Sequence, residues 1–330
     1  MPTVSVVLNC YNHERYVGEA IESVLGQTLT DVELIAIDNG STDGSASVLK
    51  AYASDERVRL LLHSSNEAIS RRLNQGVAAA RGTFVSFLYS DDFYLPTKLA
   101  RQVDVFRSLD VSYGVVYGPA LGQNDVTGAR WQYPNLAASG DVFEAFMSQH
   151  RFGQIDMISP LTRRDCLLQH RFHEDIFAEG EAIFLRLALT HRFAFLDEPL
   201  AVIRDHGGNA GKAIKRNCEF TRAAIAKMRD EPTLSPARRG LLDRFEGMLL
   251  TNYAWQGMRL DGDVRWARLC LREAANLSVR NLAHPRAMAT AGLMLLPKRA
   301  RDAVNRVGHR LKKPSGNAVY VEEYEGLSGS

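Results

Sequence analysis

The sequence predicts an α/β protein with a mostly parallel, Rossmann-like sheet that carries helices on both faces, followed by a helical C-terminal region. Two observations predict this fold class. Strand-like apolar runs alternate with amphipathic helical patterns through the first part of the chain, up to about residue 210. These strands also read as continuous apolar runs, as expected where both faces of a parallel sheet are buried.

Each element follows from a local pattern. In the first helix, apolar residues recur at spacings of three and four from Val17 to Leu25, which places them on one face. Strands are expected at 4–9, 32–38, 58–63, 84–90, 115–117, 193–196 and 201–204. The helices that accompany them are expected at 17–25, 41–52, 69–81 and 96–108.

Length and composition indicate a globular protein of more than one part. A chain of 330 residues is long enough for one large domain and a smaller one. We expect a main domain at 1–210, a helical region at 211–313 and a flexible tail at 314–330. The net charge of +2 does not suggest a nucleic-acid partner.

The cysteines and the apolar runs indicate a cytoplasmic protein. Four single cysteines, with no Cys-x-x-Cys pair, fit free thiols in a reducing compartment: Cys10, Cys166, Cys218 and Cys270. The N-terminus has no basic region before its first apolar run, so we expect no signal peptide. Because no apolar run approaches the roughly 20 residues of a membrane-spanning helix, we expect a soluble or peripheral protein.

Polar residues follow three of the predicted strands. Asn9 and Asn12 end the first strand, residues 38–43 end the second, and Asp91 and Asp92 end the fourth. The carboxyl ends of strands in an open α/β sheet are where ligands usually bind. Neither a Gly-x-Gly-x-x-Gly turn nor a Walker A sequence is present, so the pattern indicates another kind of site for a polar, nucleotide-bearing ligand.

The pair Asp91-Asp92 has two readings. Its hard oxygen ligands suit Mg²⁺ or Mn²⁺, which could in turn hold a diphosphate. Alternatively, the pair forms a turn that caps the helix beginning near Pro96. Residues 38–43 have a similar alternative, a turn followed by a helix N-cap.

Several segments in register resemble the family 2 glycosyltransferases. The similarity extends over about residues 3–210 and is carried by 4–12, 20–28, 37–43, 73–76, 80–82, 88–92 and 205–209. This resemblance implies a GT-A fold and an inverting transfer of a sugar from a nucleotide diphosphate, usually with Mg²⁺ or Mn²⁺. The acceptor would be a glycan or a lipid-linked hydroxyl in surface polysaccharide or glycoconjugate synthesis.

The resemblance also implies the residues of the donor site. Those expected to contact the nucleotide sugar are Asn9, Tyr11, Asn12, Asp38, Asn39, Asn74 and Asp91. Those expected to contact the metal are Asp91, Asp92 and His206.

Two positions depart from the family pattern. Asn39 stands where the family has an Asp that contacts the nucleotide base, often uracil, and an amide offers a donor as well as an acceptor. A UDP-sugar is the favoured donor, with the base left open. Tyr89 stands at the first Asp of the metal-binding DxD motif, which leaves Asp91 and Asp92 as its carboxylates.

The general base is expected near the start of a helix at about 181–188. Ala182 occupies the family's usual Asp position, so Glu181 is the predicted base and Glu179 its substitute. The alternative is that Glu181 only stabilises the helix N-terminus. If neither glutamate is a base, the protein would be a non-catalytic nucleotide-sugar-binding or scaffold protein on the same fold.

The C-terminal region is helical and basic toward its end. Helices are expected at 213–229, 236–258 and 264–276, followed by an apolar stretch at 287–296 and a further helix from 297. Residues 286–313 contain eight Lys or Arg against one acid, a net charge of +7. This basic helix could contact the inner face of a membrane, or it could pack on the main domain through its apolar stripe.

Overall fold

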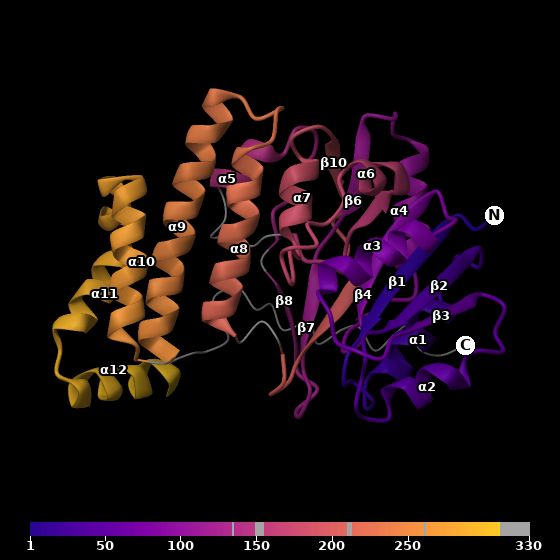
Figure 1. Cartoon of the computed structure of the whole chain (residues 1–330), viewed down its shortest axis with the longest axis horizontal. Helices are drawn as coiled ribbons and strands as arrows, with labels where there is room; N and C mark the ends of the chain where they lie inside the picture. The colour runs from indigo at the N-terminus through magenta and orange to yellow at the C-terminus, as the bar shows by residue number, and fades with distance from the viewer. Residues whose placement is uncertain (134, 149–154, 210–212, 261, 311–330) are drawn as a thin grey trace. The chain divides into compact units, whose positions relative to one another are not determined.

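The computed structural model describes residues 1–133, 135–148, 155–209, 213–260 and 262–310, and it divides into two compact units (Figure 1). Among the described residues, the first unit comprises Met1–Gly207 and the second begins at Gly208. The predicted tail at 314–330 lies outside the described residues.

A seven-stranded sheet forms the centre of the first unit. Its order is β10-β6-β9-β4-β1-β2-β3, and only β9 runs antiparallel to its neighbours β4 and β6. Strand β1 pairs in parallel with β2 through Val4 and Val32, and with β4 through Val4 and Phe84. The strands are β1 (Val4–Cys10), β2 (Val32–Asp38), β3 (Val58–Leu62), β4 (Phe84–Tyr89), β6 (Tyr113–Tyr117), β9 (Leu161–Arg163) and β10 (Arg192–Phe195).

Helices cover both faces of this sheet, because alternate residues of each strand point to opposite sides. On one face, Gly76 of α3 lies directly over Val7. On the other face, the ring of Phe84 stacks on Phe106 of α4, with centroids 4.5 Å apart. The helices of this unit are α1 (Val17–Leu25), α2 (Ser45–Ala51), α3 (Ile69–Ala79), α4 (Lys98–Arg107), α5 (Phe143–Ser148), α6 (Arg164–Gln169) and α7 (Ala182–Leu187).

The predicted fold class is therefore confirmed. The strand β3 differs from the expectation of continuous burial, since its residues are half-buried or exposed. It pairs only with β2 and forms the edge of the sheet, where one side of the strand has no neighbour.

A second sheet has four strands, in the order β5-β11-β7-β8. Within it, β11 runs parallel to β7 and antiparallel to β5. Since β5 follows β4 after only three residues, this sheet brings the end of β11 close to the end of β4. Its strands are β5 (Phe93–Tyr94), β7 (Ala120–Asn124), β8 (Arg130–Gln132) and β11 (Ala201–Asp205).

A buried lysine joins these elements beneath the strand ends. Lys98 of α4 is fully buried, and its Nζ donates to Ser86 Oγ (2.8 Å) and Gln102 Oε1 (2.9 Å). The same Nζ lies 4.2 Å from the ring centroid of Tyr94. Burial holds the pKa of Lys98 well below its usual range. The network ties β4, β5 and α4 together.

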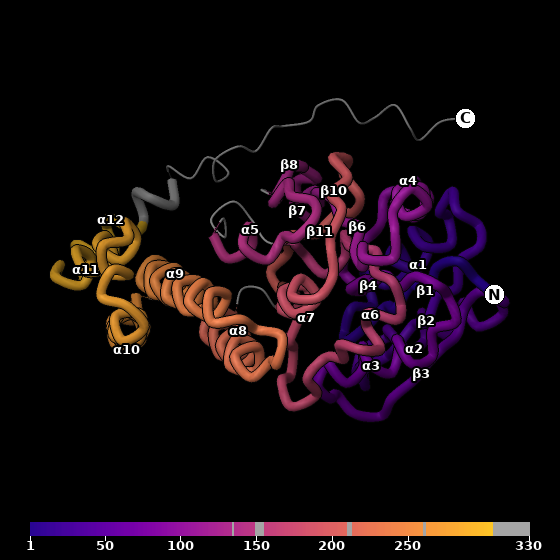
Figure 2. The backbone as a smooth tube through the Cα atoms, turned by 90° about the horizontal axis from the view of Figure 1, so that it is seen from above, coloured from indigo at the N-terminus to yellow at the C-terminus, as the bar shows by residue number. Residues whose placement is uncertain are grey.

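The second unit is helical, and Figure 2 shows its helices α9 to α12 in sequence. Its core is made by residues of α8, α9, α10 and α11, including Cys218, Leu250, Met258 and Cys270. All four cysteines of the chain are buried free thiols. The elements are α8 (Ile214–Arg229), α9 (Pro236–Leu260), α10 (Val264–Leu277), η3 (Val279–Ala283), α11 (Pro285–Leu295) and α12 (Lys298–Arg310).

In the part of the chain that the structure describes, no helix has both the length and the apolar character needed to cross a membrane.

Two helical glycines of the first unit give a matched test of helix–sheet packing. A Cβ added at Gly76 would lie 2.3 Å from Val7 Cγ1, whereas one added at Gly18 would meet nothing nearer than 3.8 Å. We expect Gly76→Ala to lower the free energy of unfolding by about 1–3 kcal/mol through overpacking. Gly18→Ala should leave it unchanged or raise it by up to about 1 kcal/mol. Urea denaturation followed by circular dichroism measures both, and equal effects would contradict the close packing of α3 on β1.

Candidate active site

The polar residues at the carboxyl ends of β1, β2 and β4 come together at one edge of the large sheet. The parallel register sets Cys10 opposite Asp38 and Asn9 opposite Tyr89. Asn9 is buried, and its Oδ1 is a buried side-chain oxygen without a hydrogen-bond partner among the described residues. An unsatisfied polar atom of this kind is unusual in a folded interior, and here it faces the edge where ligands bind.

The loops after β1 and β2 are fastened to each other by hydrogen bonds. Asn12, which has a positive φ of 55°, accepts at Oδ1 from the backbone N–H of Thr42 (2.7 Å). The backbone N–H of Asn12 donates to Ser41 Oγ (3.0 Å), and that of His13 donates to Ser45 Oγ (2.9 Å). Asn12, which is predicted to contact the donor, thus also helps to hold the backbone next to His13.

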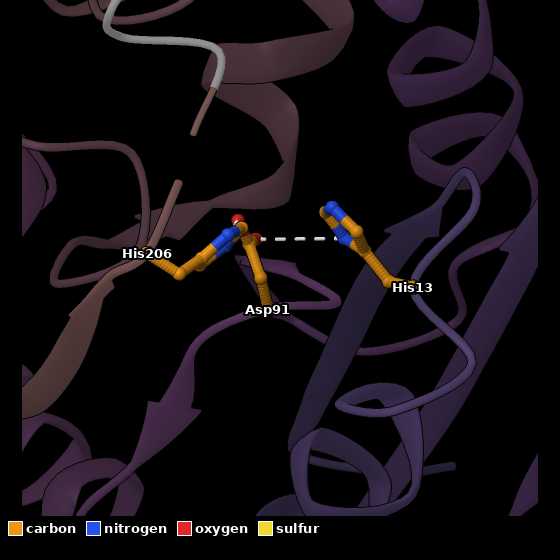
Figure 3. A group of neighbouring side chains, drawn as sticks. All are labelled: His13, Asp91 and His206. Atoms are coloured by element: carbon orange, nitrogen blue, oxygen red, sulfur yellow. Dashed lines mark hydrogen bonds and ion pairs between the residues drawn. The ribbon is translucent and has the colours of Figure 1, made fainter. Parts of the chain in front are cut away.

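Three side chains from distant parts of the sequence meet at this edge (Figure 3). Asp91 Oδ2 lies 3.1 Å from His206 Nε2, and Asp91 Oδ1 lies 3.8 Å from His13 Nδ1. One ligand atom from each residue lies within 4.8 Å of the other two. His13 follows β1, Asp91 follows β4 and His206 follows β11, so the cluster exists only when both sheets are formed.

Aromatic contacts hold the two imidazoles in place. The ring of His206 stacks on Tyr16, with centroids 4.9 Å apart and an interplanar angle of 27°. The hydroxyl of Tyr16 donates to Asp125 Oδ2 (3.0 Å). Burial lowers the pKa of His13, partly offset by the charge of Asp91, so its imidazole is held in the neutral form that can bind a metal.

This group of residues fits a divalent cation. Adjacent ligands of an octahedral ion with bonds of about 2.1–2.2 Å lie about 3 Å apart, which matches the separation of Asp91 and His206. Two imidazole nitrogens and one carboxylate favour Mn²⁺ over Mg²⁺, because Mg²⁺ prefers an all-oxygen shell.

Asp92 lies next to this group without belonging to it. It is buried, and its Oδ1 accepts from the backbone N–H of Arg204 on β11 (3.0 Å). Burial raises the pKa of Asp92 well above its usual range, and the charge of Asp91 adds to the effect. The alternative in which the pair caps a helix is wrong, since α4 begins at Lys98 with Thr97 as its N-cap.

Glu181 belongs to the same acidic part of the site as Asp91 and Asp92. Burial is the main cause of the raised pKa of the Tyr89 phenol, and the charges of Glu181, Asp91 and Asp92 add to it, so all three carboxylates lie near this phenol. Glu181 is exposed, yet the protein around its carboxyl raises its pKa by desolvation, with a contribution from the charge of Asp156. A carboxyl that is both accessible and desolvated is suited to accept a proton.

Glu181 is also the N-cap residue of α7, but its side chain makes no capping hydrogen bond. The favourable helix-dipole interaction is therefore open to it without a capping hydrogen bond.

The substitute base Glu179 lies in a different environment. Its side chain is fully buried, and its carboxylate receives Arg186 Nε (2.9 Å) and the backbone N–H of His173 (2.6 Å). The backbone N–H of Glu179 donates to Ser70 Oγ (3.0 Å). These bonds occupy the carboxylate and anchor the start of α7 to α3.

The amide of Asn39 has its hydrogen-bonding capacity filled inside the protein. Its Nδ2 donates to Asn66 Oδ1 and to the backbone carbonyl of Glu67, both at 2.9 Å. Its Oδ1 accepts from the backbone N–H of Glu67 (3.1 Å) and from Nε of the buried Arg72 (2.8 Å). Asn39 thus holds the loop after β3 against α3.

The other predicted donor contacts have varied surroundings. The amide of Asn74 pairs with both backbone polar groups of Phe172 and with Glu174. The carboxylate of Asp38 accepts from the backbone N–H of Ser41, at 3.3 and 3.2 Å for its two oxygens. Tyr11 is exposed beyond the end of β1.

The sequence did not single out His13, Tyr16 or Asp156. His13 carried one available signal, since it directly follows Asn12 at the end of a predicted strand. Tyr16 and Asp156 carried no such signal in the sequence. The position of Tyr16 in the site depends on β11, and that of Asp156 depends on the turn where its Oδ1 accepts from the backbone N–H of Ser159 (2.6 Å).

Solved structures share this fold. S. aureus TarS 1–349, in complex with UDP, aligns with a TM-score of 0.63 at 18% identity, over 92% of this chain and 89% of TarS. The mannosyltransferase PcManGT from Pyrobaculum calidifontis, in complex with GDP-Man and Mn²⁺, aligns with a TM-score of 0.59 at 17% identity, over 94% of this chain and 88% of PcManGT. The fold is therefore that of the GT-A glycosyltransferases.

The sequence comparisons find the same family over part of the chain. Residues 5–160 match the model of glycosyl transferase family 2. An uncharacterized glycosyltransferase of Nostoc sp. is 33% identical over 214 residues, 62% of this chain and 66% of the relative. EpsJ of Bacillus subtilis, also an uncharacterized glycosyltransferase, is 39% identical over 94 residues, 28% of this chain and 27% of EpsJ. The match over residues 5–160 confirms the resemblance to glycosyl transferase family 2 seen in the sequence.

The chain spans just under two thirds of the length of the Nostoc relative (66%) and about a quarter of the length of EpsJ (27%).

Replacing one imidazole tests the proposed cation ligands. We expect His13→Gln to weaken Mn²⁺ binding at least about tenfold, because it removes one of the three groups that converge on the ion. His170→Gln is the matched control, since His170 lies on the same unit and is hydrogen-bonded to Thr190. Isothermal titration with Mn²⁺ measures both variants. Unchanged Mn²⁺ affinity in His13→Gln would remove His13 from the site.

Glu179→Ala tests whether this carboxylate supports the fold. Removing it leaves the buried Arg186 without its ion pair, so we expect a loss of about 3–5 kcal/mol in the free energy of unfolding. Asp104→Ala removes an exposed partner of Arg107 and should cost about 1 kcal/mol or less. Urea denaturation compares them, and a stable Glu179→Ala variant would contradict the structural role.

Proposed function

We propose that the protein is a metal-dependent glycosyltransferase that moves a sugar from a nucleotide diphosphate to an acceptor hydroxyl with inversion. The observation that carries this proposal is the convergence of His13, Asp91 and His206 at the same sheet edge as Glu181. A cation-binding group and an accessible, desolvated carboxyl are the two components that such a transfer requires.

The cation would be held by His13, Asp91 and His206, with Mn²⁺ favoured by the two imidazoles. A divalent ion there would supply positive charge to the diphosphate of the donor. Asp92 supports the site from beneath, because its bond to the backbone of Arg204 fixes the end of β11, two residues before His206.

Glu181 would accept the proton of the acceptor hydroxyl. Its raised pKa makes it a stronger base than an ordinary carboxylate, and its exposure lets an acceptor reach it. In a single inverting displacement, the acceptor oxygen forms its bond to the sugar as the bond to the departing diphosphate breaks. Glu179 is not suited to this role, since its oxygens are engaged by Arg186 and His173.

A UDP-sugar is the favoured donor. Structures of the same fold hold UDP and UDP-GlcNAc in TarS, although PcManGT holds GDP-Man. Asn39 does not favour one base, because its amide is filled by internal partners. A thermal-shift comparison of UDP, GDP and dTDP, each with and without Mn²⁺, ranks the bases by the stabilisation they give.

The acceptor would be a glycan or a lipid-linked hydroxyl, and the protein would work in the cytoplasm, where its four cysteines would stay reduced.

Replacing the proposed base separates chemistry from binding. We expect Glu181→Gln to lower the rate of sugar transfer at least about a hundredfold and to leave the affinity for the nucleotide unchanged. Glu56→Gln, an exposed glutamate of the same unit, should transfer at the wild-type rate. Donor turnover in the presence of Mn²⁺ and nucleotide titration measure the two effects. A wild-type protein that binds nucleotide but is as inert as Glu181→Gln would favour the non-catalytic alternative.

The pH profile follows from the direction of the shift. A base acts when deprotonated, so activity falls as the pH drops through its pKa in the bound complex. Because the pKa of Glu181 is raised, this fall should begin above the range of an ordinary glutamate, whose pKa is about 4.3. An acidic limb at or below that ordinary value, measured by the rate at saturating donor, would contradict the assignment.

A further inference from the structure

The solvent-facing side of α11 carries no charged residue after Arg286. Between Arg286 and Lys298 the sequence contains no charged residue. Ala287, Thr290 and Leu293 form the buried side, while Met288 and Leu295 are exposed. A helix that is apolar on every side is normally buried all round, so its open side indicates a surface that something else covers.

The neighbouring elements continue this surface. Of the 14 large apolar residues exposed in the described chain, seven lie in this short part of the second unit, which scattered exposure would not produce: Leu269, Val279, Leu282, Met288, Leu295, Leu296 and Val304. Leu295 is 87% exposed and Met288 is 57% exposed.

A basic cavity opens beside this apolar side. It is lined by residues of α9 and of the segment leading into α11: Arg244, Met248, Thr251, Arg280, Asn281, Ala283 and His284. Arg244 and Arg280 are exposed, and neither guanidinium has an acidic partner among the residues the structure describes. The cavity therefore offers two uncompensated positive charges to an anion.

The cavity and the apolar side are continuous along α11. His284, which lines the cavity, is the N-cap of α11 and lies four residues before Met288. Leu295 follows Met288 by seven residues, so the three positions fall on one stripe of the helix.

We propose that this surface binds an anionic phospholipid bilayer. A headgroup phosphate would enter the cavity between Arg244 and Arg280, while Met288 and Leu295 would enter the boundary of the acyl chains. Residues 264–305 contain eight Lys or Arg and two Asp or Glu, a net charge of +6. This charge is complementary to anionic lipid, to which each basic residue near the surface contributes about 1 kcal/mol.

A second copy of the chain fits this surface less well than an anionic bilayer does. In a two-fold dimer the same patch would meet itself, so the cations of one copy would face the cations of the other. The lipid surface differs from the basic helix expected from the sequence after residue 297, because it is formed by α11 and the cavity. It is also independent of the transfer reaction, since it needs no donor.

Flotation of the full-length protein with lipid vesicles tests the proposal. The vesicles are phosphatidylcholine alone and an equimolar mixture of phosphatidylcholine and phosphatidylglycerol. We expect binding to the anionic vesicles only, weakened by added salt. Leu295→Glu and Arg280→Glu should each reduce this binding at least about tenfold, the first through the apolar side and the second through the cavity.

Matched controls show whether changing any exposed apolar residue or any exposed basic residue would reduce vesicle binding. Val126→Glu replaces a 92% exposed apolar residue of the first unit, and Lys50→Glu reverses an exposed charge there. Both should bind as the wild type does. Because Leu295 and Arg280 are exposed, their variants should stay folded, which circular dichroism checks.

Three outcomes would overturn the proposal. The first is a wild-type protein that binds neither kind of vesicle, or both equally. The second is undiminished binding by Leu295→Glu or Arg280→Glu. The third is a dimer, seen by analytical ultracentrifugation, that Leu295→Glu dissociates, since a second copy would then cover this side of α11.

Discussion

One hydrogen bond joins the two sheets at the place where the site forms. The backbone N–H of Arg204 on β11 donates to the buried carboxylate of Asp92, which follows β4. A buried carboxylate is costly to desolvate, so its single backbone partner matters to the fold. The bond holds the end of β11 at Asp92, and His206, two residues further along, lies beside Asp91. The cluster with His13 depends on this position of β11.

The polar residues near the site divide into two groups. Asn39, Asn74 and Glu179 are buried and have their polar atoms bonded to other parts of the protein. Asn12 is exposed, and its Oδ1 holds the loop after β2 at Thr42. Once its donors and acceptors are filled, a buried amide has little capacity for a ligand. His13, Asp91 and His206 lie beside one another, with His13 Nδ1 also bonded to Ser90 Oγ (2.8 Å). Glu181 is exposed.

The acidic region explains why a cation fits this edge. Asp91 and Asp92 are adjacent, and the charge of Asp156 raises the pKa values of Asp92 and Glu181. Like charges this close destabilise one another unless they are protonated or neutralised. The raised pKa of Asp92 relieves part of this repulsion, and a divalent ion at Asp91 would relieve more. Glu181 remains as the exposed carboxyl beside them.

The sequence by itself predicted the fold class, the resemblance to the family and the strand ends where the candidate site lies. Period-two and period-3.6 patterns are local, so β1, β2, β4 and the helices between them could be predicted from neighbouring residues. The same reasoning placed Asp91 and Glu181 at element ends. It also located the C-terminal helices and the apolar stretch that becomes α11.

Only the tertiary structure decided which of these residues meet. His13 and His206 are far apart in the sequence, and they converge on Asp91 because β11 joins the second sheet. The filled amide of Asn39 and the ion pair of Glu179 likewise depend on distant partners. Contacts of this kind have no local period and are not visible in a single sequence, since they are set by the register of strands and the packing of side chains.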